Sequence, residues 1–285
     1  MIHPGSQVLT RGKEHMRLNI AVVQFSITRF APEENLRKAE QFIQAAVSQH
    51  AQIIVFPEDF VTGPLSGNSE FADYEGRYVK HFQRLAAQYA LDIVPGSIIE
   101  GHSGGLYNTT YYIDKTGEIK GRYEKVNLWI PERSYLCPGK ELPVFETAYG
   151  KVGLIICWDL MFSETFRRMV KQDVDIVICP SYWCFEDAGI GIKHDANAEV
   201  KLVNALCVSR AFENEVVLVY ANAAGSKNIE GERLIGRSQI TVPFKGALSV
   251  LDHNGEAMFV QEVDTTLLQD AEQSYEIRND LRTRV

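Results

Sequence analysis

Apolar residues along the chain follow two spacings, one typical of buried strands and the other of amphipathic helices. Residues 17–25 (RLNIAVVQF) are apolar and rich in β-branched side chains, which predicts a strand. After Pro32, apolar residues recur at helical spacing as far as Val47. Residues 52–56 (QIIVF) are wholly apolar, as expected for a strand in a sheet that is covered on both faces.

The same alternation continues to residue 263. The spacing predicts helices over 74–90, 163–171 and 195–213. It predicts strands at 92–99, 107–114, 118–123, 152–157, 175–179, 216–222, 234–242, 247–252 and 257–263. Residues 52–58 (QIIVFPE) and 175–181 (DIVICPS) share an apolar strand that reaches a proline, which is suggestive of two similar halves. We therefore expect one α/β domain, with mixed sheets and helices outside them.

Both ends of the chain differ in composition from this alternating core. Residues 1–16 are polar and lack the apolar core of a signal peptide, so we interpret them as a flexible leader and expect no secretion. Residues 17–263 form the predicted domain. Residues 264–285 are charged and polar and are interpreted as a C-terminal tail, which could contribute to an oligomer contact.

The overall composition narrows the class of protein. Of the 285 residues, 45% are hydrophobic, so the chain is too apolar for disorder to be its main state. A formal net charge of -8 argues against non-specific nucleic-acid binding, which needs a basic face. No apolar run reaches the roughly 18 residues of a membrane span. The five cysteines form no C-x-x-C pair and indicate reduced thiols, so we expect a cytoplasmic protein.

Two residues that follow buried strands are candidates for catalysis. Cys157 ends an apolar strand and precedes a predicted helix, and a nucleophile at such an elbow is exposed beside backbone N–H groups. The alternative for Cys157 is a cysteine packed in the core. Glu58 follows the strand at 52–56, where open α/β sheets place their ligands, and could act as a general base. The alternative for Glu58 is a carboxylate on a surface loop.

Lys125 and Glu132 are further candidates, from the segment between the predicted halves. Lys125 lies among apolar residues in YEKVNLW, where an ammonium could offset a developing oxyanion; the alternative is a solvated lysine beside Glu124. Glu132 could orient the lysine or a substrate amide, or it could pair with Arg133 on a surface loop.

Taken together, these segments resemble the nitrilase superfamily of carbon–nitrogen hydrolases. The resemblance is carried by FPEDF (56–60), YEKVNLW (123–129), PERSYLCPG (131–139) and GLIICWDLMFSETFR (153–167), in the order glutamate, lysine, cysteine. It extends over residues 17–263. It implies a four-layer α-β-β-α sandwich built from two related halves, with no metal and no organic cofactor.

The resemblance also implies a role for each candidate residue. Cys157 would be the nucleophile, Glu58 the general base, Lys125 the oxyanion stabiliser and Glu132 the second glutamate found in many members. The backbone N–H of Trp158 would be a second oxyanion donor. The implied activity is hydrolysis of a small amide to an acid and ammonia through a thioester. N-carbamoyl hydrolase and nitrilase activities are alternatives with the same triad, and a homodimer or larger homo-oligomer is expected.

Two positions bear on the substrate. Many amidase-type members carry an arginine after the nucleophile, but Met161 stands at that position here, which puts any contact of that arginine with a substrate carboxylate in doubt. Tyr182 and Trp183 lie where the resemblance places the substrate pocket and suggest an apolar wall, although Trp183 could instead belong to the core.

Three other interpretations remain open from the sequence. His194 could approach Cys157 in a Cys–His hydrolase, or it could be a polar residue at a helix start. Cys179, Cys184 and His194 could be imagined as a zinc set, but their spacing lacks the usual tight ligand pairs and no H-E-x-x-H helix occurs. The third is a non-catalytic binding protein that retains the fold, against which the intact glutamate, lysine and cysteine count.

Overall fold

The computed structural model describes residues 16–102, 104–225 and 231–283, so the leader predicted at 1–16 lies outside the described residues except for Met16. The α-helices are α1 (Pro32–Ser48), α2 (Arg77–Tyr89), α3 (Ser163–Val170), α4 (Ala198–Asn214), α5 (Thr266–Tyr275) and α6 (Ile277–Thr283). The strands are β1 (Arg17–Gln24), β2 (Ile53–Val55), β3 (Asp92–Val94), β4 (Ser97–His102), β5 (Gly105–Ile113), β6 (Ile119–Glu124), β7 (Val144–Thr147), β8 (Gly150–Leu154), β9 (Ile176–Ser181), β10 (Val217–Asn222), β11 (Gln239–Val242), β12 (Gly246–Val250) and β13 (Ala257–Asp264). The short 3-10 helices are η1 (Ser69–Phe71), η2 (Pro131–Ser134), η3 (Cys157–Met161) and η4 (Phe185–Lys193).

The described strands form two mixed sheets. The seven-stranded sheet has the order β13-β1-β2-β3-β5-β4, with β6 paired to β5, and the six-stranded sheet has the order β12-β11-β10-β9-β8-β7. The centre of the first sheet is parallel through β1, β2 and β3, and the centre of the second is parallel through β8, β9 and β10. Each centre is built by a strand-helix-strand-helix-strand run, which supports the predicted pair of similar halves.

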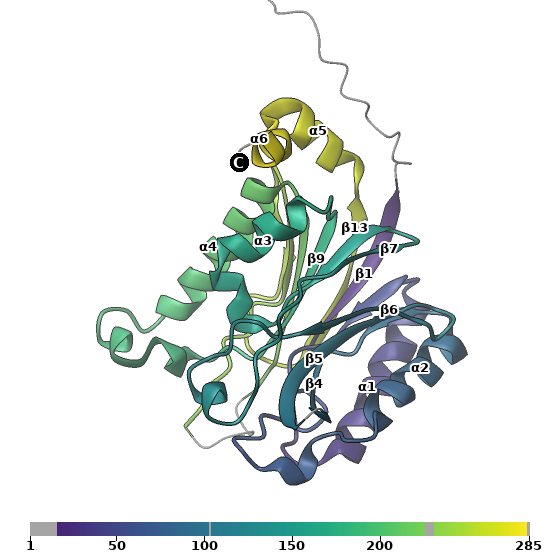
Figure 1. The fold of residues 1–285 in the computed structure, drawn as a ribbon, viewed down its shortest axis with the longest axis vertical. Coiled ribbons are helices and arrows are strands. Elements are labelled where there is room, and N and C mark those ends of the chain that lie inside the picture. Colours follow the sequence, from purple (N-terminus) through teal and green to yellow (C-terminus); the bar gives the residue numbers. More distant parts are fainter. Residues whose placement is uncertain (1–15, 103, 226–230, 284–285) are drawn as a thin grey trace, which may run out of the picture.

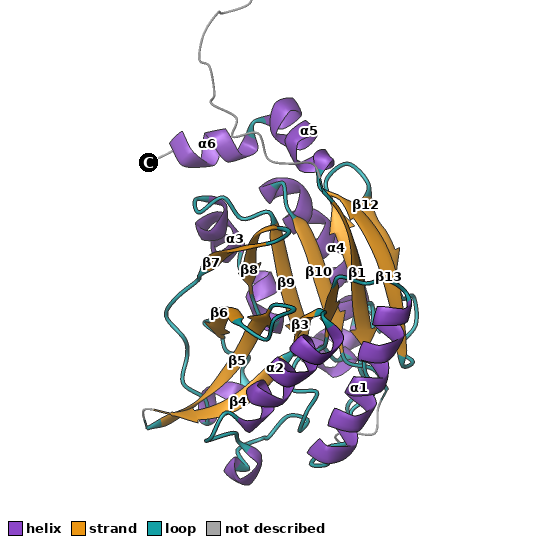
Figure 2. Ribbon diagram, turned by 90° about the vertical axis from the view of Figure 1, so that its right-hand side faces the viewer, coloured by secondary structure: helices purple, strands orange, loops and turns teal. Residues whose placement is uncertain are grey.

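The two sheets pack face to face and the helices cover their outer faces. α1 and α2 lie along the seven-stranded sheet, and α3 and α4 lie along the six-stranded sheet on the opposite side of the molecule (Figures 1 and 2). This arrangement is the predicted α-β-β-α sandwich. Two sheets that are each covered on both faces explain why the central strands are apolar throughout rather than alternating.

Alternate side chains of β1 enter two different cores, because successive residues of a strand point to opposite faces. Ile20 and Val22 belong to the core between the sheets. Ala21 and Val23 belong to the core beneath α1 and α2. Both cores are nearly inaccessible to solvent at these positions, so the strand ends that emerge from them are held rigidly.

Residues 92–99 were predicted as one strand but form two, β3 and β4. The break falls at Pro95 and Gly96, where proline cannot donate to a ladder and Gly96 has a φ of +60°. A Cβ atom at Gly96 would lie 1.9 Å from the carbonyl oxygen of Pro57, so only glycine fits this approach. The break lets β5 pair with both β3 and β4, and it brings the segment before Glu58 against this turn.

Three further segments differ from prediction. Within 234–242 only Gln239–Val242 forms a strand, and β7 was not predicted. The segment interpreted as a polar tail contains α5 and α6, which bury Leu268, Ala271 and Leu281 against the domain. No helix within the described ranges has the length and apolar character needed to cross a membrane.

Candidate active site

Cys157 lies at the elbow between β8 and η3. It is the first residue of η3, is 7% exposed, and has a φ of +46°. Non-glycine residues seldom adopt this left-handed region, and strain of this kind clusters at active sites. The predicted strand-to-helix elbow is present, and it turns the thiol toward a cavity between the carboxyl ends of the central strands.

Asp159 holds this elbow in place from inside η3. Its Oδ2 accepts hydrogen bonds from the Ile156 N–H at 2.9 Å and the Tyr123 hydroxyl at 2.7 Å. Its Oδ1 accepts from the backbone N–H and side-chain amide of Asn127, at 3.0 and 2.8 Å. Burial raises the pKa of Asp159, but these donors oppose the rise. Asp159 therefore ties the elbow to the segment that carries Lys125.

Lys125 follows β6 and is 1% exposed. Its Nζ donates to Glu58 Oε1 at 2.8 Å and lies 2.9 and 2.8 Å from Oε1 and Oε2 of Glu132. Burial alone lowers the pKa of Lys125, but Glu132 and Glu58 outweigh it and hold that pKa well above its usual value. The side chain is therefore an ammonium fixed between two carboxylates, rather than the solvated lysine that the sequence left open.

Glu58 lies at the carboxyl end of β2, after Pro57, and is 3% exposed. Besides Lys125, it accepts from the side-chain amide of Asn108 at 2.9 Å and, through Oε2, from the Tyr182 N–H at 2.9 Å. Burial raises its pKa and Lys125 lowers it. Glu58 is thus a buried carboxyl group of the site and not a surface loop residue.

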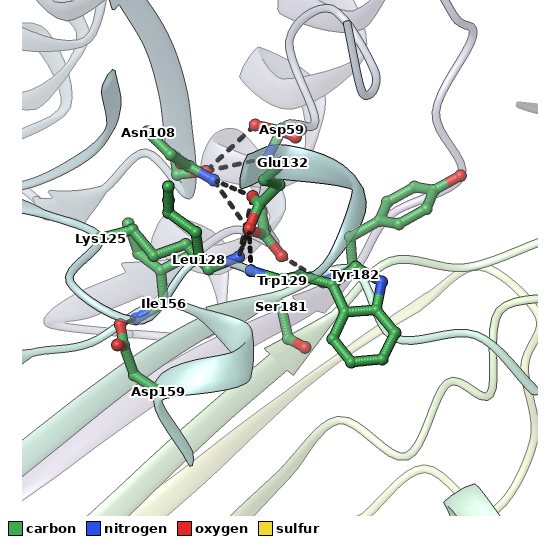
Figure 3. Close-up of polar contacts among 12 residues, drawn as sticks. Asp59, Asn108, Lys125, Leu128, Trp129, Glu132, Ile156, Asp159, Ser181 and Tyr182 are labelled. Atoms are coloured by element: carbon green, nitrogen blue, oxygen red, sulfur yellow. Dashed lines mark hydrogen bonds and ion pairs between the residues drawn. The ribbon is translucent and has the colours of Figure 1, made fainter. Parts of the chain in front are cut away.

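Glu132 completes the polar cluster from η2 (Figure 3). It is 8% exposed, accepts from the Trp129 N–H at 2.6 Å and from Asn108 at 3.1 Å, and contacts Lys125. The alternative of a surface pair with Arg133 is not formed, since Arg133 Nε donates to the carbonyl of Leu128 instead.

The surroundings of Cys157 favour the neutral thiol over the thiolate. Burial raises its pKa well above the usual value, Glu58 raises it further, and Lys125 opposes both. The negative charge of Glu58 and the positive charge of Lys125 both reach this thiol. The surroundings therefore do not preform a thiolate; they place a base and a cation beside a thiol.

These side chains line one cavity of about 310 Å³. Its wall includes five acidic residues, and Lys125 is its one lysine or arginine among the described residues. The described lining comprises Glu58, Asp59, Pro64, Ser66, Lys125, Trp129, Pro131, Glu132, Ser134, Tyr135, Cys157, Tyr182, Cys184, Asp187 and Glu232. Burial raises the pKa of Asp187 to about 7, and raises that of Asp59 well above its usual value.

The two aromatic residues predicted for the pocket separate. Tyr182 lines the cavity, and its hydroxyl donates to Glu232 at 3.1 Å. Trp183 is not part of the cavity wall: it is 1% exposed, and its indole N–H donates to Glu199 at 2.6 Å. Its ring lies 5.6 Å from that of Trp158. Because neighbouring residues of an extended chain face opposite sides, only one of the pair reaches the pocket.

The residues of the rival interpretations do not converge. His194 is exposed at the end of η4 and does not line the cavity. Cys184 is on the cavity wall, whereas Cys179 is fully buried in the core between the sheets. Among the described residues, no group of three or more His, Cys, Asp or Glu side chains is placed to hold a metal ion.

Sequence reasoning missed Asn108, which donates to both Glu58 and Glu132, and Asp159, which holds residues next to Cys157 and close to Lys125. Asn108 is an amide within a strand made mostly of β-branched and aromatic residues, and asparagine is depleted from strands. Asp159 stands three residues after Ile156, at the position from which an acidic side chain caps the start of a helix. Both signals were present, but neither identifies the distant partner.

Comparison with known proteins agrees with this fold. A family model described as carbon-nitrogen hydrolase matches residues 19–273. A probable nitrilase of Schizosaccharomyces pombe is 31% identical over 87% of this chain and 89% of its own. A 2-oxoglutaramate amidase of Bacillus subtilis is 29% identical over 94% of this chain and 98% of its own.

Solved structures share the fold. Nit3 of Saccharomyces cerevisiae, a member of the nitrilase superfamily, has a TM-score of 0.79 at 23% identity, covering 91% of this chain and 94% of Nit3. An amidase from Nesterenkonia has a TM-score of 0.77 at 23% identity, covering 92% and 95%. The chain therefore belongs to the carbon–nitrogen hydrolase family, within the nitrilase superfamily, as the motifs predicted.

Proposed function

We propose that the protein hydrolyses a small amide to an acid and ammonia through a thioester on Cys157. The observation that carries this proposal is the convergence of three buried residues, Cys157, Glu58 and Lys125, on one cavity from three separate parts of the chain. A thiol, a carboxylate and a fixed cation are the nucleophile, base and electrostatic stabiliser that acyl transfer needs. Amidases among the relatives support this reaction class.

In the first step, Glu58 takes the proton of the Cys157 thiol as sulfur bonds to the amide carbon. The carbonyl π electrons move onto oxygen, and the oxyanion is held by Lys125 Nζ and the Trp158 N–H. Trp158 is the second residue of η3, where backbone N–H groups lack intrahelical partners. Because burial and Glu58 both raise the pKa of the Cys157 thiol, we expect removal of its proton to accompany the attack rather than to precede it.

In the following steps, the tetrahedral intermediate collapses, the carbon–nitrogen bond breaks, and Glu58 returns its proton to the leaving nitrogen. A water molecule then attacks the thioester carbon while Glu58 takes a proton from it. The second collapse breaks the carbon–sulfur bond, returns a proton to sulfur and releases the acid. Glu132 also lines the cavity and holds Lys125 through both of its carboxylate oxygens.

Two other reactions use the same groups. Hydrolysis of an N-carbamoyl compound or of a nitrile also proceeds through attack by a thiolate, and relatives named nitrilase support the second. A non-catalytic binding role is disfavoured because the buried cluster of Glu58, Lys125 and Glu132 retains a strained nucleophile beside it. We rank the amide first.

The cellular setting and assembly are part of the proposal. We place the protein in the cytoplasm, where its described cysteines, all of them free, stay reduced. We also infer a homodimer or a larger homo-oligomer by analogy with the family. Light scattering coupled to size-exclusion chromatography measures the assembly directly, and a monomer at micromolar concentration would contradict it.

A product screen tests the activity. The wild type and Cys157→Ser are incubated with simple amides, carbamoyl-amino acids and nitriles, and ammonia release and product masses are followed. Serine is nearly isosteric but far less acidic, so we expect ammonia from an amide with the wild type and loss of turnover with the variant. Cys179→Ser is the matched control, a second buried cysteine that does not line the cavity. Turnover retained by folded Cys157→Ser would exclude the thioester route.

A further inference from the structure

Asn108 occupies a central position in the cluster although it carries no charge. It lies on β5 and is 1% exposed. Its Nδ2 donates to Glu58 Oε1 at 2.9 Å and to Glu132 Oε1 at 3.1 Å. Lys125 Nζ donates to the same two oxygen atoms, at 2.8 and 2.9 Å. Two nitrogens and two carboxylate oxygens therefore alternate in a closed ring.

This ring determines which oxygen of Glu58 faces the nucleophile. A carboxylate oxygen has two lone pairs in its plane, and both lone pairs of Oε1 are used by Asn108 and Lys125. Oε2 accepts from the Tyr182 N–H at 2.9 Å, so it retains one lone pair. Glu58 can thus receive the proton of Cys157 at Oε2 while Oε1 stays bound.

The amide of Asn108 has one workable orientation. Turned over, its carbonyl oxygen would face two carboxylate oxygens, so charge repulsion fixes the NH₂ toward them. In this orientation Oδ1 is buried and has no hydrogen-bond partner within the described residues. An unsatisfied buried acceptor costs stability, so the arrangement is explained by what Nδ2 does for the site. The backbone carbonyl of Asn108 also accepts the backbone N–H of Lys125 at 2.8 Å, which aligns the lysine.

We propose that Asn108 is a positioning residue that fixes the Glu58 carboxylate for proton transfer at Oε2. It also donates to the same oxygen of Glu132 as Lys125 does. The proposal rests on the proposed function, since it takes Cys157 as the nucleophile and Glu58 as its base. A neutral donor suits this place, because a second cation would neutralise the base and a further carboxylate would repel it.

The test replaces Asn108 with leucine, which is similar in size and cannot donate. Loss of the donor to Glu58 disfavours the carboxylate form and frees it to rotate. We expect kcat for the amide found in the screen to fall about 10- to 100-fold, with KM changed less than about threefold. We expect the acid limb of kcat/KM to move up by about half to one pH unit.

A second readout needs no substrate. The rate of Cys157 alkylation by iodoacetamide, followed by peptide mass, reports proton removal from the thiol, and its acid limb should shift with that of kcat/KM. Asn35→Leu is the matched control: Asn35 is also fully buried and donates through Nδ2 to the carbonyls of Thr28 and Val61, away from the cavity. This control should lose thermal stability without moving either pH profile.

The outcomes separate the two proposals. If Cys157→Ser keeps turnover, the proposed function is wrong. If Cys157 is required but folded Asn108→Leu keeps the wild-type kcat and acid limb, only the role of Asn108 is wrong. Should Asn108→Leu not fold, Asn108→Ala, which is smaller and also cannot donate, is measured in the same way and must show the same upward shift of the acid limb.

Discussion

Lys125 is a cation whose charge is shared among several oxygens before any substrate arrives. Its Nζ contacts Glu58 and Glu132 on two sides and is almost wholly shielded from water. A compact ammonium presents three N–H donors around one point, whereas a guanidinium spreads its donors over a rigid plane. The geometry therefore favours lysine specifically and not positive charge in general.

Substitution of Lys125 tests this distinction. We expect Lys125→Ala to lower kcat about 10²- to 10³-fold, the usual effect of removing one oxyanion donor. Lys125→Arg should recover little of that loss despite its charge. Steady-state kinetics are compared with thermal melts of both variants, and Lys115→Arg, at an exposed lysine, is the control. Near wild-type turnover in Lys125→Ala would make Lys125 a structural residue.

At this scale the sequence predicted the charged and nucleophilic residues but not the neutral ones between them. Cys157, Glu58 and Lys125 each follow a strand and carry reactive groups, so motif and context both identify them. Asn108 acts only through contacts with residues 24 and 50 positions away. Such contacts depend on strand pairing that a single sequence does not specify.

At the scale of elements, one carboxylate joins η3 to the segment after β6. Asp159 accepts two backbone and two side-chain donors, and no oxygen of it is spare for a water molecule. The nucleophile elbow and the lysine segment are thus held in one mutual geometry. The left-handed φ of Cys157 depends on the same contacts, because a strained residue persists only where its surroundings fix it.

Replacing Asp159 with asparagine should loosen this junction. Both oxygens of Asp159 accept hydrogen bonds, and asparagine would replace one of them with an NH₂ group that cannot accept. At least one buried N–H or hydroxyl donor would then be unpaired. We expect kcat to fall about tenfold or more. We also expect the melting temperature to fall by several degrees; each kcal/mol of lost stability lowers it by roughly 4–8 °C in a small domain and by less in a domain of this size. Tyr123→Phe, which removes one of the four contacts, should show a smaller change in both. An equal or larger effect of Tyr123→Phe would contradict the role given to Asp159.

Element prediction succeeded where burial determined the pattern and failed where long-range contacts did. The apolar central strands were predicted because both of their faces are covered. The break at Gly96 follows from the approach of Pro57, which is distant in sequence. The helices α5 and α6 were interpreted as a tail, since Leu268, Ala271 and Leu281 are the buried apolar residues described in them and most of their neighbours are polar.

At the scale of the whole molecule, we expect the packing of α5 and α6 against the domain to depend on pH. Glu215 at the end of α4 is 0% exposed and lies against the carboxyl group of Glu272 on α5, and burial raises its pKa to about 7. Arg278 on α6 opposes this rise. Unfolded glutamate has a pKa of about 4.3. The folded protein therefore holds an extra proton between about pH 4.5 and 7, and its stability falls as pH rises through that window.

Glu215→Gln should remove this part of the dependence. Glutamine is neutral at every pH, so the variant should melt a few degrees higher than the wild type at pH 8 and close to it at pH 5. Each unit by which folding raises the pKa of Glu215 corresponds to about 1.4 kcal/mol of unfolding free energy lost at high pH. Thermal melts at both pH values measure the difference, and Glu70→Gln, at an exposed glutamate, should change neither. A difference that does not grow with pH would contradict the assignment.

The acidic wall of the cavity has a consequence for turnover. An amide enters without charge, but the acid formed from it ionises in a cavity lined by Glu58, Asp59, Glu132, Asp187 and Glu232, with Lys125 as the one basic group on the described wall. Burial raises the pKa of Asp59 and of Asp187, so these two add negative charge only as pH rises through their raised pKa values. Repulsion between like charges is strong where water is scarce. The cavity should therefore bind the neutral amide substrate more tightly than the ionised acid product, which favours release of the product. We expect added product acid to inhibit weakly, with an inhibition constant well above KM in steady-state assays. Inhibition as tight as substrate binding would show that Lys125 outweighs the wall.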